Sequence, residues 1–232
     1  MKGTKAEVAE AAQSLRSAGW LSETPPDFQD AILSGCRWQW FAPGEAISHG
    51  GDIIGGMFGL AQGSVSIIPT LGVADAPIIH IGIAPFWHGS NPLINGEPRV
   101  MTIGARSRCL VARVPQYALE AVLAADPGRW RFIAQHLTYI ANLSMLVASD
   151  MQIRDSRRRC VAVLLRIANC RNGSMATATA EMTQDELAAM ANLSRQTTGP
   201  ILRELADAGL ATVGYRSIVL HDAAALRAMV AL

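Results

Sequence analysis

The stretch from Arg129 to Ile153 constrains the fold most, because it contains neither glycine nor proline and its apolar residues recur at helical spacing. Steps of three and four residues separate these apolar residues, and Ser144 takes the one polar position in the series. The stripe consists of Trp130, Ile133, Leu137, Ile140, Val147 and Met151. It extends over about three heptads, which is the lower limit for a coiled coil. The pattern predicts a long helix that pairs with a second copy of the chain; the alternative is a helix packed on its own domain.

The region before this helix consists of short β-prone runs. Between Arg37 and Val114, runs such as residues 64–68, 78–81 and 109–114 alternate with turns that contain glycine and proline. Runs of this length and spacing favour a β-barrel or β-sandwich over a βαβ fold.

The C-terminal part contains the start signals of two short helices. Thr183 and Glu186 have the spacing of a capping box, which satisfies backbone amides at the start of a helix. Ser194 is a suitable N-cap for a second helix, and Gly209 supplies the left-handed conformation that ends it. Two helices joined by such a tight turn are typical of a helix-turn-helix.

Two β-prone runs follow the second helix, at residues 211–213 and 217–220, and they predict a hairpin wing. In a winged helix-turn-helix the second helix enters the major groove of DNA, where arginine can bond guanine, glutamine can bond adenine, and threonine can touch a thymine methyl. Residues on the wing can contact phosphates, which set the register but carry no sequence information. The predicted DNA-binding residues are Thr183, Ser194, Arg195, Gln196, Thr197, Gly199, Arg203, Tyr215 and Arg216.

Composition and charge agree with a two-domain, DNA-binding chain. With 232 residues, half of them hydrophobic, the chain can form two ordinary domains. Residues 151–232 carry ten Arg against seven Asp and Glu, a net charge of +3, whereas residues 1–150 carry −2. The four cysteines are scattered and form no CxxC pair, so we expect reduced thiols and neither a disulfide framework nor a zinc site. The polar start and the lack of a membrane-length apolar run predict a cytoplasmic protein.

Enzyme signatures are missing from the sequence. There is no P-loop, nucleophile elbow or dinucleotide fingerprint. A metal-dependent cupin would need a His-x-His cluster, but His80 and His88 are eight residues apart. We therefore expect a chain that is not an enzyme.

Two sets of residues resemble one family, the Crp/Fnr regulators. Residues 194–205, SRQTTGPILREL, resemble the recognition helix of the family. Residues 41–65 follow the glycine and apolar framework of its sensor domain, and the resemblance extends from about residue 18 to 229. It implies an α+β fold: an N-terminal double-stranded β-helix (a jelly-roll-like β-roll), a long dimerisation helix and a C-terminal winged helix-turn-helix. The expected domains are a cyclic-nucleotide-binding-like sensor at 1–127, the dimerisation helix at 128–153 and the DNA-binding domain at 154–232.

The resemblance also implies an effector pocket in the sensor domain, where the chain departs from the family pattern. Cyclic-nucleotide members hold the ribose with a Phe-Gly-Glu segment and the phosphate with an Arg followed by Ser or Thr. Here the corresponding segment is Trp87-His88-Gly89, and Val100 follows Arg99, so the glutamate and the hydroxyl are missing. We expect an effector other than cyclic AMP, and Arg99 either binds another anion or is an ordinary loop arginine. The predicted pocket comprises Trp87, His88, Gly89, Arg99, Val100 and Ser144, of which Ser144 has a register role in the long helix as its alternative.

The resemblance to Crp/Fnr regulators also bears on two other cofactors, an iron–sulfur cluster and haem. Iron–sulfur members carry an N-terminal cysteine cluster, whereas Cys36 is the only cysteine among the first hundred residues, so we expect no cluster. Haem stays open, with His80, His88 and His136 as possible axial ligands or ordinary hydrogen-bonded histidines.

Three features bear on the DNA-binding head. Gln196 stands where many members have glutamate, which favours adenine over cytosine. Pro200 lies about six residues into the recognition helix, where proline lacks the amide donor, so we expect a kink or a tighter first turn. The run Arg157-Arg158-Arg159 is interpreted as a solvated helix start rather than as a phosphate or partner contact.

The sequence therefore predicts a homodimeric transcription regulator of Crp/Fnr type that reads a palindromic operator under the control of an unidentified small-molecule effector. Its expected partners are double-stranded DNA, a second copy of the chain and RNA polymerase, with no membrane. The alternative is an effector-sensing dimer whose DNA head is degenerate because of Pro200 and which acts through protein partners.

Overall fold

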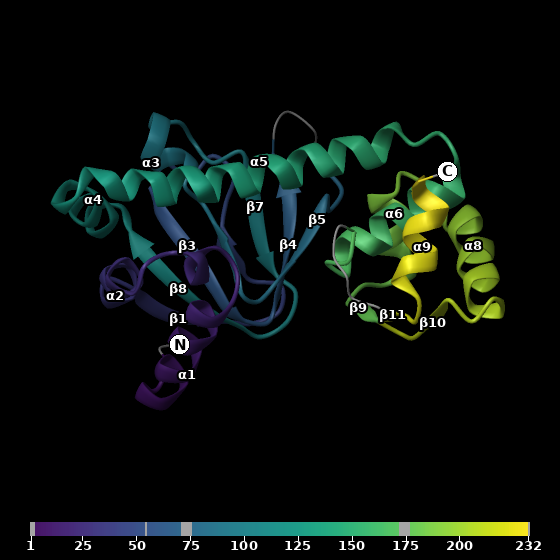
Figure 1. The fold of residues 1–232 in the computed structure, drawn as a ribbon, viewed down its shortest axis with the longest axis horizontal. Coiled ribbons are helices and arrows are strands. Elements are labelled where there is room, and N and C mark those ends of the chain that lie inside the picture. Colours follow the sequence, from purple (N-terminus) through teal and green to yellow (C-terminus); the bar gives the residue numbers. More distant parts are fainter. Residues whose placement is uncertain (1–2, 54, 71–75, 172–176, 232) are drawn as a thin grey trace. The chain divides into compact units, whose positions relative to one another are not determined.

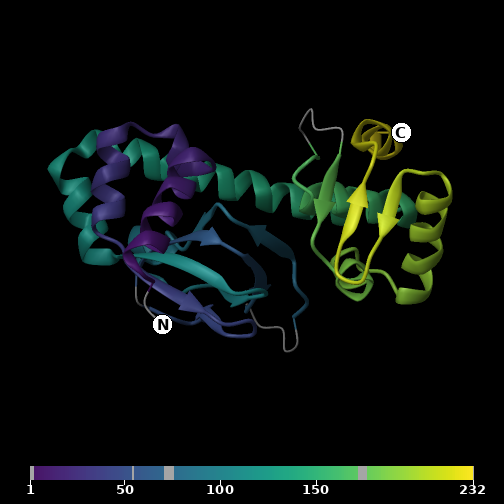
Figure 2. The ribbon, with the colours of Figure 1, turned by 90° about the horizontal axis from the view of Figure 1, so that it is seen from below.

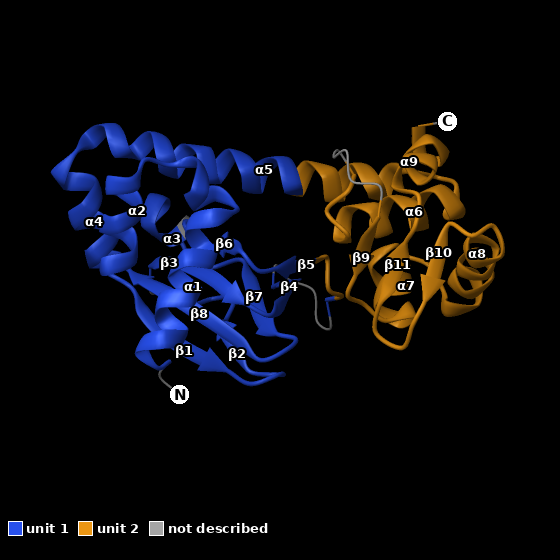
Figure 3. Cartoon of the chain, turned by 60° about the horizontal axis from the view of Figure 1, so that its bottom comes forward, with its two compact units in different colours: residues 1–76, 81–143 blue, residues 77–80, 144–232 orange. Residues whose placement is uncertain are grey.

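The structure is a computed structural model that describes residues 3–53, 55–70, 76–171 and 177–231. It divides into two compact units, shown in blue and orange in Figure 3. Unit 1 comprises Met1–Ala76 and Ile81–Leu143, and unit 2 comprises Pro77–His80 and Ser144–Leu232. The division falls inside the long helix, between Leu143 and Ser144.

Unit 1 is built around two four-stranded sheets, as the short β-prone runs predict (Figure 1). One sheet has the order β1-β8-β3-β6 and the other has the order β2-β7-β4-β5. The pairs β1–β8, β3–β8, β3–β6, β2–β7 and β4–β7 are antiparallel. This arrangement confirms the predicted α+β fold with its β-roll. The strands are β1 Arg37–Phe41, β2 Ala46–Ser48, β3 Gly56–Gln62, β4 Ser64–Pro69, β5 His80–Ile83, β6 Phe86–His88, β7 Met101–Ala105 and β8 Cys109–Pro115.

Helices cover one face of the first sheet, and the main core of unit 1 lies between them and the strands. Alternate strand residues, among them Met57, Trp87 and Ala112, point toward the helices and pack against residues such as Phe28 and Leu119. The helical elements of unit 1 are α1 Lys5–Ser17, η1 Trp20–Glu23, α2 Pro26–Ser34, α3 Asn91–Asn95, α4 Gln116–Ala125, η2 Pro127–Arg129 and the first part of α5 Trp130–Gln152.

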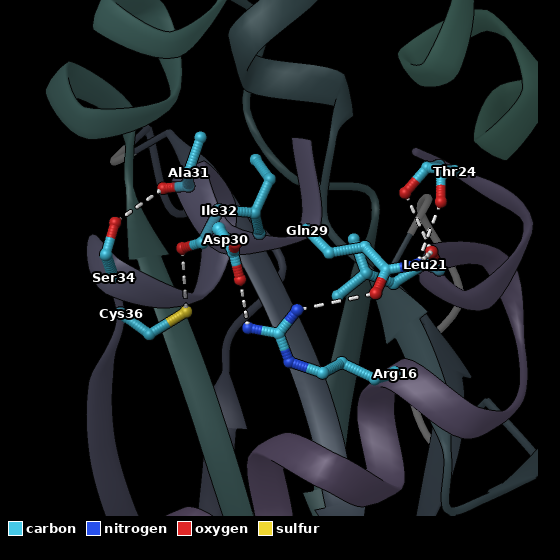
Figure 4. Close-up of polar contacts among 9 residues, drawn as sticks. All are labelled: Arg16, Leu21, Thr24, Gln29, Asp30, Ala31, Ile32, Ser34 and Cys36. Carbon is cyan, nitrogen blue, oxygen red and sulfur yellow. Dashed lines mark hydrogen bonds and ion pairs between the residues drawn. The ribbon is translucent and has the colours of Figure 1, made fainter. Parts of the chain in front are cut away.

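Polar contacts fasten the N-terminal helices to each other, as Figure 4 shows. The Arg16 guanidinium on α1 lies 2.6 Å from the Asp30 carboxylate on α2. The Gln29 amide donates hydrogen bonds to the carbonyl oxygens of Leu21, at 3.0 Å, and Thr24, at 2.8 Å. Gln29 therefore satisfies main-chain acceptors at the end of η1 and holds that turn against α2.

Unit 2 is a winged helix-turn-helix, as predicted. Its three-stranded sheet has the order β10-β11-β9, and Figure 2 shows these strands side by side in green and yellow. The pairing of Val213 with Ile218 brackets the turn of the wing. The elements are α6 Ser156–Ile167, β9 Ala178–Ala180, α7 Gln184–Met190, α8 Arg195–Asp207, β10 Ala211–Val213, β11 Ile218–Leu220 and α9 Ala223–Ala231.

Among the described residues, no helix combines the length and the apolar character needed to cross a membrane.

Candidate functional site

The caps predicted for the two helices of the helix-turn-helix are present. Thr183 and Glu186 form a reciprocal capping box: the Thr183 hydroxyl accepts from the Glu186 amide at 3.1 Å, and Glu186 accepts from the Thr183 amide at 2.7 Å. The Ser194 hydroxyl accepts from the Thr197 amide at 3.1 Å, which starts α8. Gly209 follows Ala208, the C-cap of α8, and its positive φ of 70° allows the chain to leave the helix. Local residue chemistry therefore fixes where the second helix begins and ends.

One face of α8 packs on the core of unit 2 and the other is exposed. Thr198, Ile201, Leu202 and Leu205 are buried. Arg195, Gln196, Thr197 and Arg203 are exposed, and Gly199 is half-buried. The residues predicted to face DNA on α8 therefore share the surface that is free of internal packing.

Charges near this surface are partly balanced within the chain. Arg195 lies 3.5 Å from the Asp185 carboxylate on α7, and both side chains are exposed. On the wing, the Tyr215 side chain is 93% exposed and Arg216 is also exposed. A pair between exposed charges is weak, so Arg195 can exchange Asp185 for a phosphate or a base at small energetic cost.

Pro200 lies inside α8, which is a single α-helix from Arg195 to Asp207. The expected tighter first turn is not formed. Pro200 is exposed, so its ring does not contribute to the buried stripe of the helix.

The arginines at 157–159 are mostly engaged inside unit 2, which corrects the interpretation of a solvated helix start. Arg158 donates to the Val230 carbonyl at 2.8 Å. Arg159 donates to the carbonyls of Ala191 at 2.7 Å and Ile153 at 2.6 Å. These carbonyls lie at the ends of helices, where they lack intrahelical partners and a positive charge is favourable.

A buried cluster of charged side chains, which was not predicted from the sequence, lies at the end of α5. The Asp150 carboxylate lies 2.8 Å from Arg166 and 3.0 Å from Arg171. Arg166 also donates to the Ile79 carbonyl at 3.0 Å and lies 3.2 Å from His80 Nδ1. Burial, and then the charge of Arg166, lower the pKa of His80 to about 3, so its imidazole is neutral. One feature of the sequence could have pointed to this cluster, because Asp150 is the only acidic residue of a long apolar helix.

In unit 1, Arg99 is buried and its guanidinium binds the main chain. It donates to the Gly89 carbonyl at 2.9 Å and to the Gly56 carbonyl at 3.0 Å. A Cβ atom at Gly89 would lie 2.6 Å from the guanidinium, so the glycine allows this close approach. The Val100 carbonyl accepts from the Thr70 amide at 2.9 Å and fixes the strand beside it.

The side chains of Arg99, His88 and Arg113 lie around the ring of Phe58. Strand register pairs Phe58 with His88 on one side and with Arg113 on the other. The His88 ring is stacked on the Phe58 ring, with 5.0 Å between centroids. The guanidinium carbons of Arg99 and Arg113 lie 4.9 and 5.6 Å from the Phe58 centroid. Burial, and then the charge of Arg99, lower the pKa of His88 to about 3. Phe58 and Arg113 could not be assigned to this group from the sequence, because only strand register brings them beside His88.

Trp87 does not share this face, which corrects its assignment to the effector pocket. Successive residues of a strand point to opposite faces, so Trp87 points away from the His88 side. Its ring packs edge-on against Trp20, with centroids 5.3 Å apart, in the core beneath the helices. Ser144, also assigned to the pocket, is an exposed residue of unit 2, whereas the other assigned residues belong to unit 1.

His136 joins the first half of α5 to the end of β6. His136 Nε2 lies 3.0 Å from the Trp87 carbonyl, and Nδ1 lies 3.4 Å from the Ser90 hydroxyl. A carbonyl only accepts, so Nε2 carries the hydrogen and Nδ1 accepts from Ser90. Burial lowers the pKa of His136, which agrees with this neutral ring. The three histidines weighed as haem ligands thus each have a partner: His80 with Arg166, His88 with Phe58, and His136 with Ser90 and Trp87.

The predicted dimer stripe on α5 is divided between core and surface. Ile133 is fully buried in unit 1, so its side chain belongs to the core and not to an exposed seam. Leu137 is partly buried against the same core, Ile140, Val147 and Met151 are half-buried, and Trp130 is 45% exposed. A neighbouring face of small and apolar residues is exposed along the helix. It consists of Ala134, Thr138, Ala141, Met145 and Ala148, at alternating steps of four and three residues.

Two family models match successive parts of the chain. Residues 38–126 match the cyclic nucleotide-binding domain, and residues 158–229 match the Crp-like helix-turn-helix domain. The matches cover the two parts in which the sequence resembles Crp/Fnr regulators, and in the same order.

Curated relatives and solved structures agree with these matches. The chain is 25% identical to the cyclic AMP receptor protein of Thermus thermophilus, over 87% of this chain and 91% of that protein. It is 27% identical to the HTH-type transcriptional regulator Cmr of Mycobacterium tuberculosis, over 97% of this chain and 90% of that protein. The solved structure of the c-di-GMP responsive global regulator CLP of Xanthomonas campestris has the same fold, with a TM-score of 0.66, 20% identity, and coverage of 85% of this chain and 99% of that one.

Proposed function

The chain belongs to the Crp/Fnr family of transcription regulators, and we propose that it acts as a homodimer that reads a palindromic operator under the control of an effector other than cyclic AMP. The observation that carries this proposal is the capped helix α8, which presents Arg195, Gln196 and Thr197 on a face free of internal packing.

The exposed residues divide into base-reading and phosphate-binding groups. Gln196 can bond adenine through N6 and N7 in the major groove, and Arg195 can bond guanine or a phosphate. Arg203, Tyr215 and Arg216 are exposed on α8 and the wing, where contacts to phosphates would fix the register of the domain. The continuous α8 and the intact caps favour this reading head over a degenerate one.

The homodimer is supported by the exposed face of α5. Its residues, Ala134 to Ala148 at steps of four and three, have the spacing that lets two helices pack along their length. Trp130 and Met145, respectively 45% and 71% exposed, would be shielded from water by such packing. A two-fold dimer places two copies of α8 on successive turns of DNA, so the operator has two half-sites one helical turn apart. RNA polymerase is the proposed further partner.

The chemistry around Arg99 argues against cyclic AMP as the effector. The guanidinium already donates to the carbonyls of Gly56 and Gly89, and neither a carboxylate at Gly89 nor a hydroxyl at Val100 accompanies it. A cyclic phosphate and a ribose hydroxyl would lack the partners that their burial requires. We propose that the effector is a different small molecule bound inside the β-roll.

Selection of duplexes from a random library by the purified full-length protein tests this function. We expect enrichment of a palindrome whose half-sites lie about 10 base pairs apart, centre to centre, with an adenine that Gln196 reads. Gln196→Ala should relax the preference at that adenine, by about 1–3 kcal/mol. Gln152→Ala makes the same change at an exposed position of α5 and serves as the control. No enrichment of any sequence at low salt would contradict the proposal.

A further inference from the structure

Pro200 lies on the exposed face of α8, one turn after Gln196. The two residues are four positions apart, and in a helix such residues lie above one another on the same face. Both are exposed, whereas Thr198, Ile201 and Leu202 point into unit 2. The pyrrolidine ring is therefore part of the surface that presents Gln196.

Packing within the chain does not account for a proline at this position. A proline inside a helix has no amide to donate, so the Gln196 carbonyl loses its partner in the helix. The ring is exposed and fills no place in the core. A Cβ atom at the preceding Gly199 would have only the Arg203 side chain within 4 Å, at 3.7 Å, so the neighbouring backbone is also open. A local cost to the helix that no internal contact offsets is typical of a functional surface.

The polar side chains around Pro200 leave few groups for reading bases. The hydroxyls of Ser194 and Thr197 lie 2.9 Å apart in the cap, and the Thr198 hydroxyl donates to the Ser194 carbonyl at 3.0 Å. Gln196 has no partner of this kind among the described contacts, and its amide can bond adenine. Next to it, Pro200 offers an apolar surface without donors.

The spacing of these two groups matches the spacing of bases. Four residues of α-helix rise about 6 Å, and base pairs of B-DNA are about 3.4 Å apart. Two neighbouring contacts from Gln196 and Pro200 along the groove thus fall on base pairs one or two steps apart. In the major groove, the group that suits an apolar ring is the C5-methyl of thymine.

We propose that Pro200 is a specificity-determining residue whose ring contacts the methyl group of a thymine within two base pairs of the adenine read by Gln196. This inference rests on the proposed function and adds the second base of the half-site. The contact has no charge, so it selects sequence without increasing the salt dependence of binding.

The test uses the palindrome enriched by selection and replaces each thymine in turn by uracil, symmetrically in both half-sites. Uracil keeps every hydrogen-bonding group of thymine and lacks the methyl. For the wild-type protein we expect one thymine position at which uracil weakens binding about fourfold per half-site, the effect of one buried methyl group. Pro200→Val, which keeps an apolar surface, should retain this discrimination. Pro200→Ser should lose it and bind the thymine and uracil duplexes equally.

Unfolding of the variants cannot explain the expected loss, because serine and valine both tolerate a helix better than proline. Thermal unfolding of Pro200→Ser and Pro200→Val at or above the wild-type midpoint checks this directly. If Pro200→Ser and the wild-type protein discriminate equally at every thymine, the inference is wrong while the enriched palindrome keeps the proposed function intact. If no palindrome is enriched, both the proposed function and the inference fail.

Discussion

The carboxylate of Asp150 lies 2.8 Å from Nε of Arg166, and neither side chain is more than 1% exposed. The pair joins the last turn of the long helix α5 to α6, the first helix of the DNA-binding unit. Arg171 adds a second bond to the same carboxylate at 3.0 Å. A buried charge is stable only while it is paired. We therefore expect the packing of α5 against α6 to be destabilised by the loss of any one of these three charged side chains.

Removing the charge of Asp150 should destabilise the protein strongly. Asp150→Asn leaves Arg166 buried without a counter-charge, and we expect the free energy of unfolding to fall by about 3–5 kcal/mol. Denaturant unfolding measures the loss. Asp207→Asn removes an exposed carboxylate from α8 and should change stability by less than about 0.5 kcal/mol. Equal effects of the two substitutions would show that the buried pair has no special role.

The buried histidines should make the protein sensitive to acid. Burial, with the charge of Arg99, lowers the pKa of His88 to about 3 in the folded state, whereas an unfolded histidine titrates near 6.5. Between these values the unfolded chain binds a proton that the folded chain does not. Stability therefore falls as the pH decreases from about 6.5 toward 3, by up to about 1.4 kcal/mol per pH unit for each such group.

Replacing His88 by glutamine should weaken this pH dependence. We expect the difference in unfolding free energy between pH 7.5 and pH 5 to shrink by about 2 kcal/mol in His88→Gln, because the neutral amide does not titrate. His49→Gln makes the same change on an exposed side chain and is the control. The same difference between the two pH values in His88→Gln and the wild-type protein would contradict the assigned state of His88.

Cyclic AMP should not stabilise this protein. A ligand that binds the folded state raises the unfolding midpoint in proportion to the logarithm of its concentration above Kd. Since Arg99 is engaged by Gly56 and Gly89, we expect the thermal midpoint to be unchanged at about 1 mM cyclic AMP, far above the Kd of a specific site. A saturable rise that is lost in Arg113→Met would place the nucleotide in the β-roll and overturn this expectation.

DNA binding should depend only moderately on salt, because several arginines of unit 2 point inward. Arg158, Arg159 and Arg166 bind internal carbonyls or Asp150, which leaves Arg195, Arg203 and Arg216 exposed on α8 and the wing. Each phosphate contact contributes about −0.9 to the slope of log affinity against log salt. Arg203→Ala should therefore reduce the slope by about two per dimer and weaken binding to all sequences alike, whereas Gln196→Ala should change sequence preference at constant slope. If Arg203→Ala changed the sequence preference and Gln196→Ala reduced the salt slope, Arg203 would be the base-reading residue and Gln196 the phosphate contact.

Local chemistry made the DNA-binding unit predictable from its sequence. The capping residues Thr183 and Ser194, the glycine at 209 and the hairpin after it each act within a few residues of chain. Their hydrogen bonds form in the predicted places, so the helix boundaries and the exposure of Gln196 follow from the sequence. A β-barrel or β-sandwich was likewise predictable from the short runs broken by glycine and proline, and the resemblance to Crp/Fnr regulators narrowed this class to a β-roll.

Periodicity, in contrast, could not say which neighbour would cover each face. The apolar series on residues 130–151 predicted one continuous seam, but Ile133 packs into the core of its own unit and a neighbouring face is exposed. An apolar stripe shows that one face of a helix is removed from water. It does not show whether the covering surface is the core of the same unit or a second copy of the chain.

The sequence by itself thus determined the β-rich class of the first part, the long helix after it, the start and end of the recognition helix, and the chemistry of that helix's exposed face. Only the tertiary structure decided that Trp87 belongs to the helical core, that Phe58 and Arg113 gather beside His88, and that Asp150 pairs with Arg166. The physical reason is the range of the interactions. Caps and turns are satisfied within one turn of chain, whereas strand register and buried ion pairs join residues that lie far apart along it.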